Sequence, residues 1–300
     1  IYGAHSGIGT LPVVFFGSDF QKEKYLEKLA TADWISAYAL TEPEAGSDAL
    51  SGTASAVMTE DGDGYLINGT KQFITNIGLE NASIVLVAAT VAGPDQKENI
   101  STFIVPKDAP GFKLGKRYQK MAWHASATHE VILSDCRIPK DHLLGDPDRG
   151  FAQHLAVLET GRISIAAMAV GVAQACLDES LKYARGRKQF GEPIFNFQAV
   201  QFKLVDMAVA IELARNQYLK AAWLKDQGEP FTQAGAEAKL FATEMAERAC
   251  YSAIQIHGSY GYSREYPVEA MYKAARLMTI GEGTSEIQRL VIARKILEEL

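Results

Sequence analysis

Cysteine is scarce in this chain. Only Cys136, Cys176 and Cys250 occur in 300 residues, and no two of them have C-x-x-C spacing. An odd number of widely separated cysteines argues against a disulfide framework or a zinc site and favours a reducing compartment. The histidines also lack metal-ligand spacing. We therefore expect no metal site, and we interpret four of them as ordinary polar or core residues: His124, His129, His154 and His257.

An excess of basic residues is also missing. The 30 lysines and arginines are scattered among 36 aspartates and glutamates, and the formal net charge is -6. Because nucleic-acid binding needs a basic patch, this balance argues against a nucleic-acid partner. No uninterrupted apolar run is long enough to span a bilayer, and nothing resembles a signal peptide. We expect neither a nucleic-acid partner nor a membrane span.

Two common nucleotide-binding motifs are absent. No G-x-G-x-x-G and no P-loop follows a predicted strand, so a Rossmann-type nicotinamide site is not supported. Disorder is also unexpected, because 47% of the residues are hydrophobic and only 10 are proline. This length and composition allow about two domains with sizeable cores. The first residue is Ile1 rather than Met, which indicates that the chain begins within a longer polypeptide.

The pattern of apolar residues changes twice along the chain. Residues 1–33 read as helical pieces, with Phe20, Leu26 and Leu29 on one stripe, and they are too short to form a core alone. Residues 34–148 contain short β-rich runs separated by turns, which predict a small antiparallel β domain. The predicted strands are Ile35 to Leu40, Tyr65 to Asn68, Ser83 to Ala89, Thr102 to Val105 and Glu130 to Leu133.

Residues 149–300 are helical and long. Glycine and proline separate four segments of this kind, which predicts a four-helix bundle. The predicted helices are Phe151 to Arg185, Phe197 to Lys225, Gln233 to His257 and Ser285 to Leu300. The fold class expected is α+β and multidomain, with a partial helical domain, a middle β domain and a C-terminal bundle.

The sequence is organised around a carboxylate near its end. Glu282 stands between two glycines, just ahead of Ser285-x-x-Gln288, which reads as a capping box that opens the last helix. The apolar face of this last helix is expected to consist of Ile287, Leu290, Val291 and Leu297. Glu282 therefore lies on a loop whose glycines allow close approach of a ligand. The alternative is a solvated carboxylate at a helix start.

Two polar stretches lie between the predicted strands. Residues 38–48 leave a strand with hydroxyls, carboxylates and a glycine turn, and residues 69–76 place an aromatic ring beside hydroxyl and amide groups. A planar heteroaromatic ligand needs donors and acceptors at its edge and an apolar cover on its face. Both stretches also fit ordinary turns, since these residue types favour turns anyway.

Five motifs give the chain a resemblance to a known family. They are residues 39–48 (ALTEPEAGSD), 71–76 (KQFITN), 187–191 (RKQFG), 255–261 (QIHGSYG) and 281–286 (GEGTSE). In this order and spacing they resemble the acyl-CoA dehydrogenase family over essentially the whole chain. The resemblance implies an N-terminal helical domain, a middle β-barrel and a C-terminal four-helix bundle, with FAD between the last two. Only the tail of the first domain is present, so we expect a natural polypeptide roughly a hundred residues longer.

The resemblance also implies roles for individual residues. Arg187 and Gln189 match residues that reach the FAD of a neighbouring subunit, and Phe73 stands where the family often has Trp. The implied cofactor contacts are Tyr38, Leu40, Thr41, Ser47, Phe73, Ile74, Thr75, Arg187, Gln189, Phe190, Gln198, Gln255, Gly258, Ser259, Thr284 and Glu286. The implied substrate contacts are Ser47, Glu159, Arg162 and Gly283.

For the base, the family offers two locations. Some members carry it on a bundle helix immediately before the arginine that matches Arg162, where this chain has Gly161. Glu159 is rotated about 200° away from that position on a helix, so it is a poor substitute. Glu282 is the remaining match. The resemblance thus implies that Glu282 removes the α-proton of an acyl-CoA while a hydride passes to the flavin, giving the trans-2-enoyl-CoA.

Several further expectations follow from the resemblance. The partners would be acyl-CoA and an electron-transferring flavoprotein, and the protein would form a homodimer or homotetramer in the cytoplasm of a bacterium or the mitochondrial matrix of a eukaryote. An oxidase of the same fold and a non-catalytic acyl-CoA-binding relative remain as alternatives. Gly281 replaces a common aromatic, which suggests room for a branched acyl group. Ala270 and Ala274 replace a basic and an acidic residue, so a polar pairing is expected to be missing.

Overall fold

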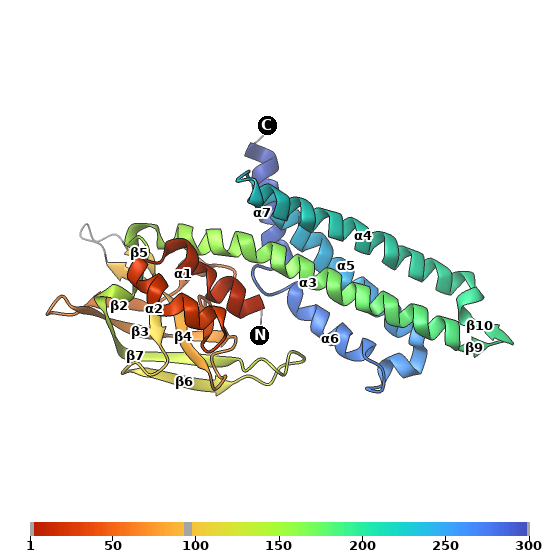
Figure 1. Cartoon of the computed structure of the whole chain (residues 1–300), viewed down its shortest axis with the longest axis horizontal. Coiled ribbons are helices and arrows are strands. Elements are labelled where there is room, and N and C mark those ends of the chain that lie inside the picture. Colours follow the sequence, from red (N-terminus) through yellow and green to blue (C-terminus); the bar gives the residue numbers. More distant parts are fainter. Residues whose placement is uncertain (1–2, 93–97, 299–300) are drawn as a thin grey trace. The chain divides into compact units, whose positions relative to one another are not determined.

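The computed structural model describes residues 3–92 and 98–298 and divides into two compact units. The units are Ile1–Leu158 and Glu159–Leu300, and each is described by itself. The first contains the sheet and the second contains most of the long helices (Figure 1). The boundaries expected from the sequence, 1–33, 34–148 and 149–300, stay a prediction.

The first unit is built on one eight-stranded sheet. The strands follow the order β6-β7-β3-β2-β4-β5-β8, and β1 pairs with β4 outside this path. Most pairings are antiparallel, but β1 and β2 both run parallel to β4, so the sheet is mixed. The strands are β1 (Ile35–Ala39), β2 (Ser55–Met58), β3 (Gly64–Ile74), β4 (Ala82–Ala92), β5 (Glu98–Pro106), β6 (Phe112–Arg117), β7 (His129–Pro139) and β8 (Leu143–Leu144).

The five predicted strands correspond to β1, β3, β4, β5 and β7, while β2, β6 and the two-residue β8 were not predicted. The strands β2 and β6 are poorly buried: Val57 and Met58 of β2 are exposed, and β6 has no fully buried residue. β2 has four residues and buries only Ala56, and β6 contributes only the partly buried Phe112 and Leu114 to the core, so each gives only a short, weak strand signal in the sequence. The buried core of the sheet comes from longer strands, for example Ile67, Val85 and Phe103.

Two short helices pack on the face of β4 and β5 that is turned away from this core. They are α1 (Leu11–Phe16) and α2 (Asp19–Ala30), and a capping box between Ser18 and Gln21 starts α2. Tyr25 and Leu29 of α2 are fully buried against Ile84 and Ile104 of the sheet. Phe20, expected on the same apolar stripe, is 49% exposed instead, because the buried face of α2 follows Gln21, Tyr25 and Leu29. The sheet therefore supplies the core that these pieces lack on their own.

The second unit is a helical bundle. Its helices are α3 (Gly150–Gly186, which begins in the first unit), α4 (Gln198–Asp226), α5 (Thr232–His257), α6 (Val268–Met278) and α7 (Ser285–Glu298). A short hairpin of β9 (Lys188–Gln189) and β10 (Glu192–Pro193) joins α3 to α4. Figure 1 shows α3, α4 and α5 side by side, and hydrogen bonds from Arg215 to Gln174 and from Thr232 to Glu159 tie them together.

One helix of this unit was not predicted, and one expected helix cap was wrong. The bundle region contains a fifth helix, α6, whose apolar residues Val268, Ala275 and Met278 are buried at helical spacing. The last helix is capped by Thr284 rather than Ser285: the Thr284 hydroxyl accepts the Ile287 N–H at 3.3 Å.

The predicted apolar face of α7 is also not buried. Leu290 and Leu297 are 52% and 68% exposed, and the buried residues of α7 are Ser285 and Gln288. Within this chain, polar contacts hold the fully buried side of α7, whereas Leu290 and Leu297 face outward and Ile287 and Val291 are partly buried.

The helix α3 is long and apolar enough, by length and composition alone, to cross a membrane. No membrane-spanning segment was expected from the sequence. One helix of this kind is weak evidence, because a core helix passes the same test, and α3 buries polar side chains such as His154, Arg162 and Ser180.

Candidate active site

Glu282 lies on the loop between α6 and α7, as expected from its flanking glycines. Glu282 and Gly283 both have positive φ, at 55° and 91°. Left-handed backbone is unusual for a residue with a side chain, and such conformations cluster at functional sites. Hydrogen bonds from Gly281 N–H to Leu277 O at 2.9 Å and from Ser285 N–H to Thr279 O at 3.0 Å close the loop at both ends.

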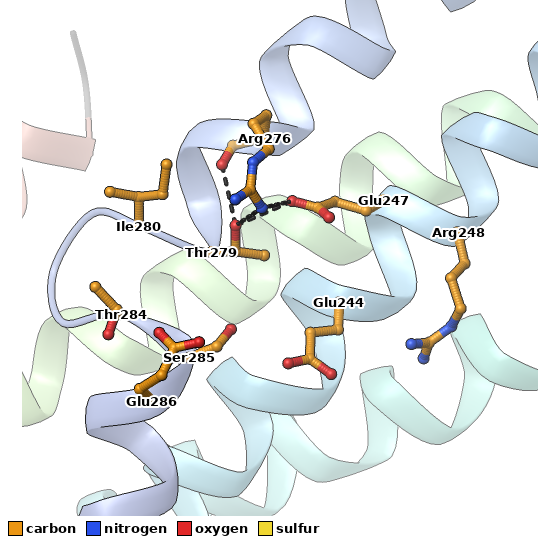
Figure 2. A pocket seen from close by; sticks show the side chains of 9 residues that line it. All are labelled: Glu244, Glu247, Arg248, Arg276, Thr279, Ile280, Thr284, Ser285 and Glu286. Carbon is orange, nitrogen blue, oxygen red and sulfur yellow. Dashed lines mark hydrogen bonds and ion pairs between the residues drawn. The ribbon is translucent and has the colours of Figure 1, made fainter.

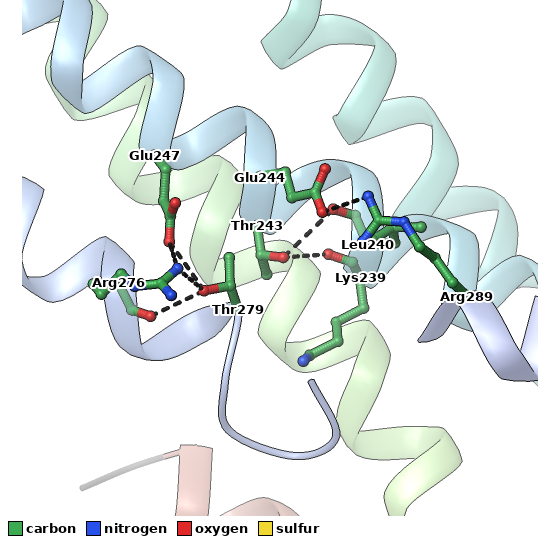
Figure 3. Close-up of polar contacts among 8 residues, drawn as sticks. All are labelled: Lys239, Leu240, Thr243, Glu244, Glu247, Arg276, Thr279 and Arg289. Atoms are coloured by element: carbon green, nitrogen blue, oxygen red, sulfur yellow. Dashed lines mark hydrogen bonds and ion pairs between the residues drawn. The ribbon is translucent and has the colours of Figure 1, made fainter. Parts of the chain in front are cut away.

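The carbonyl of Gly283 is the main anchor inside this loop. It accepts hydrogen bonds from the ammonium group of Lys239 on α5 and from Gln288 Nε2 on α7, the latter at 2.9 Å. Lys239 and Gln288 are both fully buried. Figure 3 shows the Lys239 side chain extending from α5 toward the loop. Lys239 was not predicted as a site residue, because a lysine in such a segment is expected to be exposed; in the structure it lies on the buried small-residue face of α5, between Gly235 and Ala242.

Burial changes the acidity of the two charged groups at this loop. The residue Glu282 is partly exposed, but its Oε2 is buried without a hydrogen-bond partner among the described residues. Burial raises the pKa of Glu282 to about 7, and the charge of Lys239 acts in the opposite direction. Burial likewise lowers the pKa of Lys239 to about 8, against the effect of Glu282. A carboxylate with a pKa near neutrality is suited to accept a proton at physiological pH.

Arg162 of α3 contributes a buried positive charge to the same region. It is 6% exposed, and its Nε and Nη1 atoms have no hydrogen-bond partner in the described part of the chain. Burial lowers the pKa of Arg162, while nearby Glu159 raises it. Glu159 itself accepts a hydrogen bond from Thr232 at 2.9 Å. Unpartnered buried donors are costly, so the Arg162 guanidinium is ready to bind an anionic or carbonyl group.

A cavity of about 370 Å³ adjoins the start of α7. Thr284 and Glu286, two of the implied cofactor residues, line it together with Ser285 (Figure 2). On its other side, Arg276 pairs with Glu247 at 2.7 Å, and the hydroxyl of Thr279 donates to the same carboxylate.

A second group of implied cofactor residues lies at the far end of α3. Arg187, Phe190 and Ser259 are exposed there, near the β9–β10 hairpin and the turn after α5. The guanidinium of Arg187 lies 5.8 Å from the ring centre of Tyr260, which brings the two segments together. Phe190 is 96% exposed and has a positive φ of 52°. The other members of this exposed group are Gln189, Gln198, Gln255 and Gly258.

The two groups on the bundle are far apart. An α-helix rises 1.5 Å per residue, so the stretch from Arg162 to Arg187 spans about 37 Å. Lys239 interacts electrostatically with both Arg162 and Glu282, which places Glu282 at the Arg162 end. Glu282 and Arg187 therefore lie near opposite ends of this stretch of α3 in the same chain.

In the first unit, Tyr38 of β1 contacts a buried histidine, His154. The Tyr38 hydroxyl lies 2.5 Å from His154 Nδ1, and Thr102 Oγ1 lies 3.0 Å from His154 Nε2. Burial is the main cause that lowers the pKa of His154 to about 4, so the ring is neutral near pH 7. These contacts fit the interpretation of His154 as a core histidine.

The loop after β1 is fixed by a buried ion pair. Lys71 Nζ lies 2.7 Å from Glu42 Oε1 and donates to the Leu40 carbonyl at 3.1 Å. The Thr41 carbonyl accepts the N–H of Gln72 at 2.9 Å. Leu40 and Thr41 are partly exposed. The implied flavin-edge residues are therefore held by β3.

The residues after β3 that are implied to cover the flavin differ in the exposure of their side chains. Phe73 is 59% exposed, has a φ of 57° and lies 4.5 Å from the ring of Tyr118. Thr75 is partly exposed, but Ile74 is 2% exposed and packs in the sheet core. Ser47 is exposed on the preceding loop. The Ile74 side chain is therefore turned into the sheet core, next to an irregular register between Lys71 and Ile74, and a role for Ile74 in covering the flavin stays a prediction.

A carboxylate with a raised pKa on strained backbone, together with a buried lysine and an unpartnered buried arginine, is typical of an enzyme site for proton transfer. Two family models match the chain: "Acyl-CoA dehydrogenase, C-terminal domain" over residues 148–297 and "Acyl-CoA dehydrogenase, middle domain" over residues 37–136. The chain belongs to the acyl-CoA dehydrogenase family. It is therefore an oxidoreductase with the fold that the sequence resemblance implied.

Two curated relatives illustrate this membership. A probable acyl-CoA dehydrogenase of Bacillus subtilis is 54% identical over 297 residues, covering 99% of this chain and 77% of the relative. The mitochondrial short-chain specific acyl-CoA dehydrogenase of Rattus norvegicus is 47% identical over 286 residues, covering 95% of this chain and 68% of the relative.

Solved structures also resemble this chain over nearly its whole length. Butyryl-CoA dehydrogenase from Megasphaera elsdenii has a TM-score of 0.94 and 40% identity, over 98% of this chain and 76% of that one. An acyl-CoA dehydrogenase complexed with FAD from Bacillus anthracis has a TM-score of 0.94 and 35% identity, over 99% and 53%. A chain from a study of the electron-transferring flavoprotein of Acidaminococcus fermentans has a TM-score of 0.94 and 42% identity, over 98% and 77%.

Proposed function

We propose that this chain catalyses α,β-dehydrogenation of an acyl-CoA thioester to the trans-2-enoyl-CoA, with Glu282 as the base that removes the α-proton. The observation that carries the proposal is the state of the Glu282 carboxylate. It stands on a strained loop, its Oε2 is buried without a partner among the described residues, and burial raises its pKa to about 7. Such a group accepts a proton from a weak carbon acid more readily than a solvated carboxylate does.

The residues around Glu282 suit a thioester substrate. The unpartnered guanidinium atoms of Arg162 are available to the acyl-CoA. Developing enolate charge needs fixed donors, and backbone N–H groups of the loop at Glu282 are suited to this task because the loop is held at both ends. A non-catalytic acyl-CoA-binding relative would not need a carboxylate at this place.

The cofactor of the proposed reaction is FAD, which when bound accepts the hydride from the β-carbon and passes electrons on to an electron-transferring flavoprotein. The exposed, positive-φ Phe73 beside Tyr118 offers an aromatic surface for a planar ring. The cofactor-bound relative from Bacillus anthracis and membership in the family support this assignment. The name of the Acidaminococcus fermentans structure supports the electron acceptor.

The distance between Arg162 and Arg187 supports a homodimer or homotetramer. Since about 37 Å of helix separates the two groups of implied cofactor residues, we propose that Arg187, Gln189 and Phe190 serve the FAD of a neighbouring subunit. An apolar face on α4 supports self-association. Its members are 54% to 61% exposed and follow helical spacing: Phe202, Val205, Val209 and Leu213.

The proposal is tested by anaerobic stopped-flow measurement of flavin reduction with butyryl-, octanoyl- and branched acyl-CoA. Glu282→Gln keeps the size and hydrogen-bonding capacity of the side chain but removes proton acceptance. We expect FAD and acyl-CoA still to bind, while the rate of flavin reduction falls by about 10²–10⁴-fold. In the parent enzyme the rate should rise with pH through about 7, since the base must be ionised.

Glu159→Gln is the matched control and should reduce the rate much less, because Glu159 is held by Thr232. A Glu282→Gln enzyme whose flavin is reduced at nearly the parent rate would refute Glu282 as the base. An oxidase is the alternative reaction. Rapid reoxidation of the substrate-reduced enzyme by air would identify it, whereas slow reoxidation supports transfer to an electron-transferring flavoprotein.

A further inference from the structure

Lys239 is a buried lysine that the reaction described above does not use. It lies in the middle of α5, its side chain is fully buried, and its ammonium group donates to the Gly283 carbonyl. A lysine is rarely buried unless it is paired, because an ammonium ion loses its hydration. A functional role would account for the burial of Lys239 beside the loop that carries Glu282.

The loop that Lys239 contacts is strained. Two consecutive residues, Glu282 and Gly283, adopt left-handed backbone. For Glu282, which has a Cβ, this conformation costs of order 1–3 kcal/mol and persists only where the surroundings hold it. Lys239 and Gln288 provide the two side-chain donors at the Gly283 carbonyl, one from each side of the loop.

Two other cations near the loop are paired with carboxylates. Arg276 of α6 pairs with Glu247 at 2.7 Å, and Arg289 of α7 pairs with Glu244 at 2.7 Å (Figure 3). On α3, Arg162 interacts with Glu159 and with Lys239. On α7, Glu286 lines the neighbouring cavity. Lys239 is the cation whose charge acts on Glu282 among these groups.

We propose that Lys239 is a positioning residue for the base: its ammonium group holds the loop through the Gly283 carbonyl, and its charge favours the ionised, proton-accepting form of Glu282. The inference rests on the proposed function, in which Glu282 is the base. It has two separable parts, the hydrogen bond that orders the loop and the charge that tunes the carboxylate.

Three substitutions separate these parts. Lys239→Arg keeps both donor and charge, Lys239→Gln keeps a donor without the charge, and Lys239→Met loses both. Lys220→Met, on the exposed face of α4, removes the same charge elsewhere in the bundle and is the control. Each holoenzyme is tested for flavin reduction by acyl-CoA as a function of pH, and for amide hydrogen exchange at residues 281–285 without substrate.

We expect Lys239→Met to exchange faster at residues 281–285 and to move the pH midpoint of flavin reduction upward by about 1–3 units, since an opposite charge shifts a carboxylate by this much. Lys239→Gln should show the same upward shift of the pH midpoint, but slower exchange at residues 281–285 than Lys239→Met. Lys239→Arg should keep the midpoint of the parent. Lys220→Met should match the parent in both measurements.

Unchanged midpoint and unchanged exchange in Lys239→Met would overturn the inference. A Lys239→Met enzyme that loses FAD or unfolds leaves the comparison of Lys239→Gln with Lys239→Arg, and equal midpoints in these two would also overturn it. Failure of the proposed function would give a different result. Either no acyl-CoA would reduce the flavin of the parent, or the flavin of Glu282→Gln would be reduced at the normal rate. Hydrogen exchange at residues 281–285 would still report the contact of Lys239 with the loop.

Discussion

The ammonium group of Lys71 lies 2.7 Å from the carboxylate of Glu42, and both side chains are almost completely buried in the sheet unit. Glu42 also accepts hydrogen bonds from Thr53 N–H and from Ala54 N–H, at 2.6 and 3.1 Å. Burial alone would raise the pKa of Glu42, but the hydrogen bonds from Lys71, Thr53 and Ala54 lower it overall. This pair ties the loop of the implied flavin contacts to β3.

Removing one partner of this pair should be costly. Lys71→Met leaves the Glu42 carboxylate buried without its cation, and we expect the free energy of unfolding to fall by about 3–5 kcal/mol. The double variant with Glu42→Gln should lose less than the sum of the two single variants, because it leaves no buried charge. Urea unfolding curves of the four proteins give these values.

The exposed pair of Arg137 and Asp61 is a matched control for this experiment. It has the same 2.7 Å separation, but its side chains are 53% and 50% exposed. Arg137→Met should therefore change the unfolding free energy much less than Lys71→Met does. Equal effects of the two substitutions would show that the Lys71–Glu42 pair has no special structural role.

The raised pKa of Glu282 should make stability depend on pH. The folded-state value of about 7 lies above the value of about 4.3 for an unperturbed glutamic acid. The folded protein therefore binds the extra proton, so stability from this group is full below about pH 4 and is lost as the pH rises through about 7. We expect Glu282→Gln to become more stable relative to the parent as the pH rises from about 5 to 7.5.

Thermal unfolding of the parent and of Glu282→Gln across this pH range checks the prediction. Glu159→Gln serves as a control that removes a carboxyl from the same bundle and should keep the parent's pH dependence. Parallel curves for the parent and Glu282→Gln would mean that the Glu282 carboxyl is not buried in solution as it is here.

Arg187 should link cofactor binding to assembly. If its guanidinium serves a neighbouring subunit, Arg187→Ala should loosen FAD, and a charged residue on the exposed face of α4, such as Val209→Glu, should favour the monomer. FAD release on dilution and sedimentation velocity measure the two effects. We expect Val209→Glu also to lose FAD, although it lies on a different helix from Arg187. A monomer that retains FAD normally would contradict both parts.

Gly281 should influence the acyl group that the site accepts. A Cβ at this position would meet only the Leu277 carbonyl oxygen within 4 Å, at 3.5 Å, so the backbone tolerates a side chain. We expect the parent to accept acyl groups that branch near the thioester, and Gly281→Tyr to lower kcat/KM for these substrates relative to straight chains. Gly281→Ala should fall between the two. A strong preference of the parent for straight short chains, unchanged in Gly281→Tyr, would contradict this prediction.

Much of the bundle was predictable because it depends on local signals. The glycines around Glu282 and the punctuation between helices are read directly from neighbouring residues. Burial of Lys239 was not predictable in this way. In a segment such as AEAKLFATE a lysine reads as solvated, and only the packing of α5 against the α6–α7 loop turns it inward. Thr284 and Ser285 are both suitable N-cap residues, with Ser somewhat preferred, and the loop geometry selects Thr284.

The length of α3 has a genetic consequence. Since each complete site is proposed to combine Glu282 of one chain with Arg187 of another, two different defects need not fall on the same site. A mixed dimer of Glu282→Gln and Arg187→Ala chains would contain one site with both defects and one with neither. Two alleles that are each inactive alone would therefore restore activity when expressed together, a complementation that a site confined to a single chain does not allow.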